Sequence, residues 1–169
     1  LPAYLDRACS GDYVIKWPDN VPDVGGHVIA SVPQIDPSVI LPKEQWMLKA
    51  VASELAEGRN VLLFGWHTDV LPRLVTLLQN AGVDTAYLEA DKVPTGKRQA
   101  WIDRMVVKPN KRVMVVNPVT VQTGLNNLVH FHTSMWLENP ACNPVTYRQA
   151  QGRIDRIGQT LPTRFMFPL

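Results

Sequence analysis

The sequence predicts a three-layer α/β domain with a mostly parallel sheet over residues 43–169, preceded by an irregular, Pro-rich segment over residues 1–42. From Lys43 onward, helix-like and strand-like apolar patterns alternate regularly, which favours parallel strands joined by helical crossovers. Six of the 14 prolines lie in residues 1–42, where they oppose long helices and central strands.

The elements of the second part follow one another with short connections. An apolar stripe predicts a helix from Lys43 to Gly58, and the continuous apolar run Val61–Gly65 predicts a strand that is covered on both faces. The helix over residues 96–107 is expected to turn Ile102, Met105 and Val106 inward. In order, the remaining expected elements are a helix from residue 69 to 80, strands over 85–88, 112–116 and 129–137, a helix after residue 143, and a strand over 164–167.

The first part gives less information. Its short apolar run at residues 27–32 is compatible with an edge hairpin and equally with a flexible connection from a preceding domain. The chain begins with Leu1 rather than methionine and stops within an expected strand, so we expect a piece of a longer protein. Residues 1–42 then form either a lead-in or a connection between two lobes.

Composition and charge set the broad class. Of the 169 residues, 46% are apolar and 19% are charged, which is ordinary for a globular domain. No apolar run approaches the roughly 20 residues that span a bilayer, so a cytoplasmic protein without a membrane partner is expected. Residues 43–169 hold 15 basic and 10 acidic side chains, an excess that permits contact with a polyanion without demanding it.

The segment Asn143–Gln159, NPVTYRQAQGRIDRIGQ, carries the strongest functional pattern. On one helix, Gln149, Arg153 and Arg156 stand at i, i+4 and i+7 and therefore share a narrow arc. Two guanidiniums beside an amide suit the oxygens of a phosphate, although a solvated basic face is the plain alternative. The expected buried side of this helix consists of Tyr147, Ala150, Ile154 and Ile157, with Asn143 as N-cap and Gly158 as the stop.

The string QAQGRIDRIGQ resembles the last motif of superfamily two helicase-like ATPases, and its RIGQ ending resembles the SWI/SNF-type branch. The resemblance implies the C-terminal RecA-like lobe of such an ATPase. It implies that Arg153 and Arg156 are arginine fingers toward ATP held on an N-terminal RecA-like lobe, and that Gln149 helps to orient them. It further implies Mg²⁺ held mainly by that other lobe, and double-stranded DNA as a partner.

The loop Asn117–Asn127, NPVTVQTGLNN, follows an expected strand at the carboxyl edge of the sheet, where open α/β folds bind ligands. It resembles motif V of the same family in its shorter bacterial and phage versions. The resemblance implies that Thr120 and nearby amides contact a DNA phosphate, and that Gly124 and Asn126 lie near the nucleotide. A plain polar loop is the alternative interpretation.

Two further pairs are candidates for contact with nucleic acid. Trp66 and His67 follow the first strand of the second part, where an aromatic ring can stack on a sugar or base, although such a tryptophan is more often part of a core. Lys97 and Arg98 begin an expected helix, and the family resemblance suggests that they hold a phosphate of the DNA backbone.

Other chemistries are disfavoured. The fragment TGKR lacks the earlier glycine and the following Ser or Thr of a phosphate loop, so this lobe is not expected to hydrolyse ATP alone. His130, His132 and Cys142 could supply metal ligands, but their spacing matches no recognised zinc site, and we predict no metal.

The sequence therefore predicts the C-terminal motor lobe of a DNA-dependent ATPase, a translocase or remodeller of bacterial or phage origin rather than a nuclear one. A RecA-like module that serves only as a binding or scaffold domain is the alternative. A strand-separating helicase or a nuclease-linked defence enzyme with the same motor is a third possibility.

Overall fold

The computed structural model describes residues 13–17, 27–121, 124–138 and 144–168. The chain divides into two compact units, residues 1–41 and 42–169. In the first unit, β1 (Tyr13–Trp17) pairs antiparallel with β2 (His27–Val32), with an irregularity between Ile15 and Lys16. Of the two expectations for residues 27–32, the structure has the hairpin, and its partner strand lies within the segment that was expected to be irregular.

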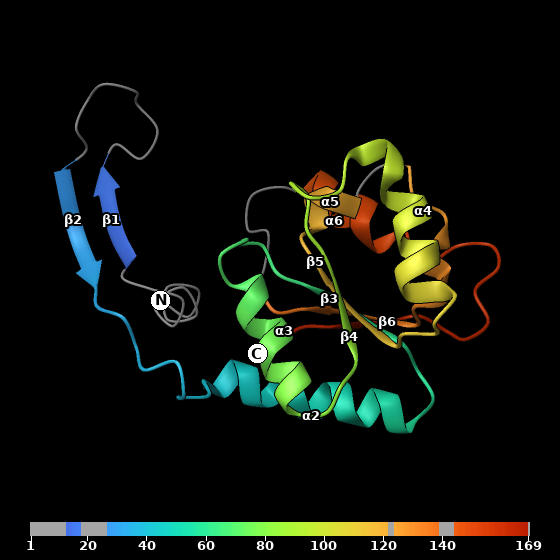
Figure 1. Cartoon of the computed structure of the whole chain (residues 1–169), viewed down its shortest axis with the longest axis horizontal. Helices are drawn as coiled ribbons and strands as arrows, with labels where there is room; N and C mark the ends of the chain where they lie inside the picture. The colour runs from blue at the N-terminus through green and yellow to red at the C-terminus, as the bar shows by residue number, and fades with distance from the viewer. Residues whose placement is uncertain (1–12, 18–26, 122–123, 139–143, 169) are drawn as a thin grey trace. The chain divides into compact units, whose positions relative to one another are not determined.

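The second unit is built on one sheet of five parallel strands in the order β4-β5-β3-β6-β7. These strands are β3 (Val61–Phe64), β4 (Thr85–Leu88), β5 (Val113–Val116), β6 (Thr133–Trp136) and β7 (Arg164–Met166). Two helices, α2 (Pro42–Ala56) and α3 (Leu71–Asn80), pack on one face (Figure 1). The other face carries α4 (Arg98–Ile102), α5 (Pro118–Val121) and α6 (Pro144–Gln151). The predicted three-layer α/β fold is confirmed.

Side-chain alternation along the strands divides the core into two layers. In β3, Leu62 and Phe64 pack toward α4 and α6, whereas Val61 and Leu63 pack toward α2 and α3. All four side chains of β3 are fully buried, and so are the four side chains of the neighbouring strand β5. A parallel strand covered on both faces reads as an unbroken apolar run, which is the pattern that identified this strand in the sequence.

Two sequence-based expectations for the segments around β6 and α4 are wrong. The expected strand over 129–137 is shorter, because residues Asn127–His130 form a 3-10 turn, η3, and only Thr133–Trp136 joins the sheet. Met105 is 41% exposed, although Ile102 and Val106 are buried as expected. After α4 the helix widens into a π-type turn, η2 (Asp103–Val107), in which successive side chains no longer follow the α-helical spacing.

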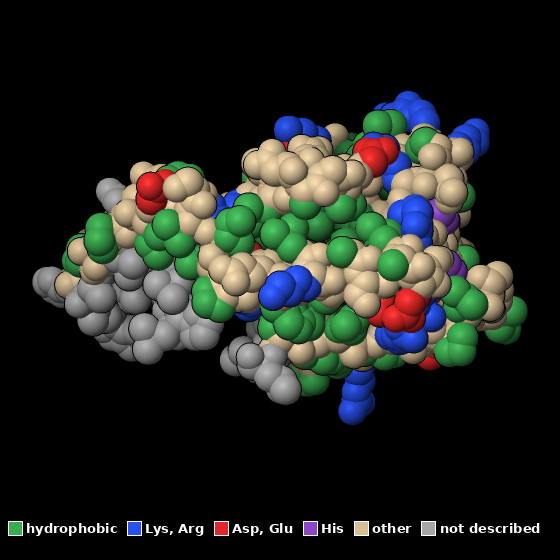
Figure 2. Space-filling model, turned by 90° about the horizontal axis from the view of Figure 1, so that it is seen from below, with side chains coloured by type: hydrophobic (Ala, Val, Ile, Leu, Met, Phe, Trp, Pro, Cys, Tyr) green, Lys and Arg blue, Asp and Glu red, His purple; other side chains and the backbone are tan. Residues whose placement is uncertain are grey.

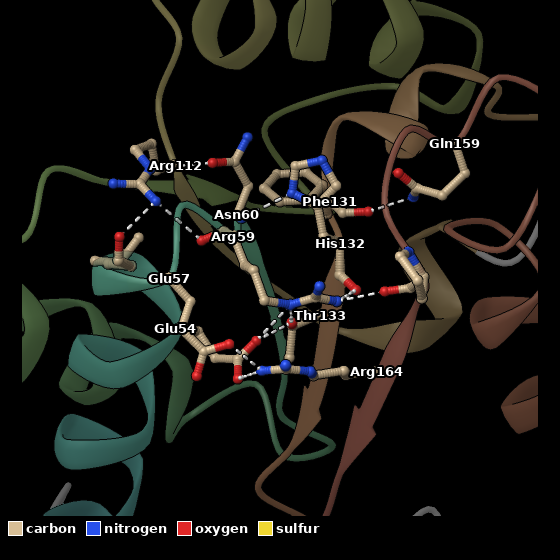
Figure 3. Close-up of polar contacts among 12 residues, drawn as sticks. Glu54, Glu57, Arg59, Asn60, Arg112, Phe131, His132, Thr133, Gln159 and Arg164 are labelled. Carbon is tan, nitrogen blue, oxygen red and sulfur yellow. Dashed lines mark hydrogen bonds and ion pairs between the residues drawn. The ribbon is translucent and has the colours of Figure 1, made fainter.

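A buried ionic network joins α2 to the amino-terminal ends of the strands (Figure 3). Glu54 is 3% exposed and accepts hydrogen bonds from Arg59 Nε at 2.9 Å, from Arg164 Nη1 at 2.8 Å and from the Thr133 hydroxyl. Burial raises the pKa of Glu54, but the bonds from Thr133 and Arg164 and the charges of Arg164 and Arg59 bring it below its ordinary value. Glu54 therefore carries a charge that the network compensates.

Next to this network, His132, Asn60 and Arg112 link the segments that lead into β6, β3 and β5. The backbone N–H of Asn60 donates to His132 Nδ1 at 3.0 Å, and Arg112 Nε donates to Asn60 Oδ1 at 3.1 Å. Arg59 Nη2 also donates to the carbonyl of His132 at 2.8 Å. Burial lowers the pKa of His132, with further lowering by the charges of Arg59, His130 and Arg112.

The face of the molecule beneath α2 in Figure 1 has mixed character. In Figure 2, which views the molecule from that side, red acidic and blue basic side chains lie next to one another at several places among green apolar ones. On this face, among the residues described, no wide area carries basic charge alone.

We predict that Glu54→Ala lowers the free energy of unfolding by about 3–5 kcal/mol, because it leaves the buried Arg59 guanidinium without its carboxylate. The matched control is Glu57→Ala, which removes a carboxylate bonded to the same Arg164 but about half exposed. Urea denaturation of both variants gives the comparison, and equal losses would contradict a special role of the buried charge.

We predict that His132 lowers the stability of the fold as the pH falls below 6.5, the ordinary pKa of histidine. The pKa of His132 in the folded chain lies below its ordinary value of 6.5, so folding favours the neutral ring. This stabilisation is complete above pH 6.5 and is lost as the pH falls through the folded-state pKa. In His132→Asn, an amide oxygen can accept the Asn60 N–H without titrating. Thermal melting against pH should therefore show a shallower acid loss for this variant, and parallel curves would contradict the assignment.

Candidate functional site

The segment with the two arginines is only partly helical. α6 ends at Gln151. After it, the backbone hydrogen bonds join residues three apart instead of four, from Arg153 N–H to Ala150 O and from Ile154 N–H to Gln151 O, each at 3.2 Å. Glycine is a poor helix former, so Gly152 is a physical reason for the helix to end there. The prediction of one helix through residue 157 is therefore wrong.

The shorter helix changes which side chains are buried. Ala150 and Ile154 lie in the core as predicted, and Tyr147 packs against it. Ile157 is fully exposed, contrary to its predicted burial, because the 3.6-residue spacing no longer applies past Gln151. Gly158 has φ of +102°, the left-handed conformation that favours glycine. The predicted N-cap, Asn143, lies outside the described residues.

Both arginines contact the loop that follows α5. Arg153 Nη1 donates to the carbonyl of Leu125 at 3.4 Å, and Arg156 Nη1 donates to Asn126 Oδ1 at 2.7 Å. Arg156 Nε also donates to the Gly152 carbonyl at 3.0 Å, which fixes the guanidinium against its own turn. The structure thus brings Arg153 to Leu125, 28 residues earlier in the sequence, and Arg156 to Asn126, 30 residues earlier.

The electrostatics of this pair favour an anion. Burial lowers the pKa of Arg153, and the positive charge of Arg156 lowers it further. Arg156 is exposed, and among the described residues no carboxylate pairs with it. A guanidinium has five N–H donors, so the two bonds of Arg156 leave three for a ligand. Such a group binds phosphate oxygens readily.

Two further candidates, Gly124 and Gln149, lie in the loop after α5 and on α6. Gly124 lies in the loop with φ of +71° and with open space around it. The reason for glycine there is the left-handed backbone conformation, because no neighbouring atom would collide with a side chain. Gln149 is exposed on α6, and no hydrogen bond links it to either arginine within the described chain. The roles predicted for Gly124 and Gln149 toward a nucleotide stay predictions.

Three of the residues predicted to contact DNA lie near the start of α4. Thr120 is 4% exposed, and its carbonyl accepts a bond from Arg98 Nη1 at 2.9 Å. Arg98 also donates to the carbonyls of Val93 at 3.2 Å and Ala90 at 3.4 Å, so its guanidinium holds the connection between β4 and α4 in place. Lys97 is exposed at the end of the 3-10 turn η1 (Thr95–Lys97). Of the three side chains, that of Lys97 is the most accessible to a phosphate.

Trp66 and His67 lie where three strands end at the carboxyl edge of the sheet. Their backbone N–H groups donate to Glu138 Oε2 at 2.6 and 2.8 Å, and Asn117 Nδ2 donates to the Trp66 carbonyl at 2.6 Å. Burial raises the pKa of Glu138, while bonds from the His67 and Trp66 amides and nearby positive charge oppose the rise. Stacking by Trp66 and His67 stays a prediction.

Sequence reasoning missed Glu138 and the side chain of Asn117. The available signal was their position, since each follows directly after an apolar run that forms a strand, and the carboxyl ends of parallel strands share one edge. Glu138 is 5% exposed and holds the connection after β3 in place.

The described residues give no support to the zinc alternative. His130 Nε2 lies 2.8 Å from the Lys111 carbonyl and His132 Nδ1 accepts a backbone N–H, while Cys142 lies outside the described residues. No group of three or more potential ligands gathers among the residues described. Likewise, none of the described helices is long and apolar enough to cross a membrane.

Comparison with known proteins supports the fold. No protein-family model matches the chain, and no curated protein matches it. Among solved structures, the chain is similar to the "C-terminal part of Fun30 ATPase domain", with a TM-score of 0.66 and 23% sequence identity. The similarity covers 74% of this chain and 40% of the Fun30 chain, so this chain spans less than half of its structural relative. The fold is thus the RecA-like α/β fold that the sequence predicts.

We predict that Glu138→Ala raises hydrogen exchange at the Trp66 and His67 amides about tenfold or more, because both donors lose a buried acceptor. Glu138→Gln retains an oxygen that can accept both bonds and is the matched control. Site-resolved exchange that is unchanged in Glu138→Ala would show that this carboxylate does not hold the connection.

Proposed function

We propose that this chain is the C-terminal motor lobe of a SWI/SNF-type, DNA-dependent ATPase. The observation that carries the proposal is the approach of Arg156 to Asn126, which joins the turn after α6 to the loop after α5 and leaves guanidinium donors exposed. The two contacting strings, QAQGRIDRIGQ and NPVTVQTGLNN, are also the two that resemble motifs of that family.

The chemistry assigned to this lobe is stabilisation of charge. ATP with Mg²⁺, held mainly on an N-terminal RecA-like lobe, supplies the phosphoryl group that is transferred to water. Arg153 and Arg156 donate to its oxygens as negative charge develops there, an effect worth roughly a thousandfold or more in rate. Asn126 and the Gly152 carbonyl hold Arg156 in place, which lowers the entropic cost of that contact.

The mechanical cycle follows from the division of the site between two lobes. Binding of ATP draws the lobes together, because the arginines of one lobe reach phosphates held by the other. Hydrolysis weakens that contact, and the lobes separate. If both lobes hold the backbone of double-stranded DNA, each cycle moves the protein by a short step. The similarity to part of an ATPase domain supports this assignment at the level of the fold.

We predict that Arg156→Ala in the full-length protein lowers DNA-stimulated ATP hydrolysis about a thousandfold, and that Arg153→Ala lowers it comparably. Arg148→Ala is the matched control, because Arg148 is an exposed arginine on α6. Arg156 is exposed, so its removal should leave the unfolding midpoint unchanged.

The outcomes separate the proposal from its rival. A rate near that of wild type in both variants refutes the finger assignment. A full-length wild-type protein that binds DNA but does not hydrolyse ATP supports the scaffold alternative instead.

A further inference from the structure

A glutamine side chain closes the loop that carries Arg156. Gln159 Nε2 donates to the carbonyl of Ile154 at 2.8 Å. The same nitrogen donates to the carbonyl of Phe131 at 2.8 Å (Figure 3). Gln159 Oε1 accepts the backbone N–H of Thr160 at 2.9 Å. Both N–H donors of this carboxamide are therefore used within the chain itself.

The two carbonyls that accept these bonds belong to segments that the core holds in place. Ile154 and Phe131 are fully buried, in the same apolar cluster as Leu125 and Leu128. Leu125 lies in the loop after α5 and Leu128 lies in η3, so residues 125–131 form one wall that is fixed to the core. Gln159 thus connects the arginine segment to the same wall that the two arginines contact.

Between Ile154 and Gln159 the chain forms a short exposed loop. Residues 155–158 are all exposed, and Arg156 is the second of them. Gly158 has φ of +102°, so the chain turns back there and Gln159 reaches the carbonyl of Ile154. The backbone N–H of Gln159 also donates to the Arg156 carbonyl at 3.0 Å. One end of the loop is held by the burial of Ile154, and the other end is held by the side chain of Gln159.

The side-chain bonds of Arg156 hold only the end of that side chain. The guanidinium donates to Asn126 Oδ1 at 2.7 Å and to the Gly152 carbonyl at 3.0 Å, while the backbone that carries it lies in the exposed loop. A loop that is free at one end samples many backbone conformations, and the entropy lost on ordering it opposes each contact of its side chains. Closure of the loop by Gln159 removes that freedom before a ligand arrives.

We propose that Gln159 is a positioning residue for Arg156 and acts through the backbone of residues 155–158. The inference deepens the proposed function and rests on it for the reaction that Arg156 serves. Because both N–H groups of Gln159 are used within the chain, its contribution is to hold the loop in the conformation in which Arg156 meets phosphate oxygens. Such preorganisation raises the rate without a contact between the residue and the substrate.

The test is ATP hydrolysis by the full-length protein with saturating DNA. We expect Gln159→Ala and Gln159→Met to lower kcat about tenfold to a hundredfold and to leave the KM for ATP unchanged, because a contact made in the transition state is weakened. Methionine keeps the length of the side chain but has no N–H donor, so a loss shared by both variants is due to the missing bonds. Gln79→Ala, which removes an exposed glutamine from α3 on the other face of the sheet, is the matched control. Circular dichroism melting confirms that the variants are folded.

A double-mutant cycle separates positioning from a general loss of structure. In the Arg156→Ala background, Gln159→Ala should lower the rate no further, because the group that it positions is absent. An equal loss in both backgrounds shows that Gln159 acts independently of Arg156 and overturns the proposal. A raised KM for ATP with unchanged kcat also overturns it.

A measurement without turnover distinguishes this inference from the proposed function. NMR relaxation reports the order parameter of the Arg156 Nε–H group in the full-length protein without nucleotide. We expect this order parameter to fall from the rigid range, about 0.85, to below about 0.6 in both Gln159 variants, and to stay unchanged in Gln79→Ala. An unchanged value in the Gln159 variants overturns the positioning role even if Arg156→Ala abolishes hydrolysis. A lowered value together with a wild-type rate in Arg156→Ala supports the hold of Gln159 on the loop and refutes the finger assignment alone.

Discussion

The arrangement depends on one constraint, which is that all five strands of the second unit run in the same direction. Their carboxyl ends therefore meet at one edge, and the connections after β3, β5 and β6 come into contact there although they are far apart in the sequence. The bonds of Glu138 to the Trp66 and His67 amides, and of Asn117 to the Trp66 carbonyl, join these three connections. The direction of the strands therefore decides which connections can form a ligand site at this edge.

The charged side chains of the domain lie in two kinds of surroundings, one buried and one exposed. At the amino-terminal ends of the strands, Glu54 and Arg59 are buried together and link α2 to the sheet. At the turn after α6, Arg156 remains exposed and is oriented by a neutral amide and a carbonyl. A neutral partner fixes direction without cancelling charge, so the guanidinium keeps its attraction for an anion. Buried and exposed arginines of this domain therefore differ in the partners that hold them.

Sequence patterns were sufficient for the layers and for most elements. The unbroken run Val61–Phe64 and the alternating helices gave the parallel sheet, because burial on both faces leaves a clear apolar pattern. They were insufficient where local backbone geometry decided the outcome. The end of α6 at Gln151 and the π-type turn at Asp103–Val107 depend on hydrogen-bond patterns that apolar spacing does not encode. The contact of Arg156 with Asn126 requires tertiary structure, although both residues stood out individually in the sequence.

The most direct test of the central claim is a structure of the full-length protein with DNA, Mg²⁺ADP and a fluoride analogue of the transferring phosphoryl group. The account predicts that a terminal nitrogen of Arg153 or Arg156 lies about 2.7–2.9 Å from the analogue, the length of a charge-assisted hydrogen bond. Both guanidiniums pointing to solvent, or paired with carboxylates away from a closed nucleotide site, would contradict it.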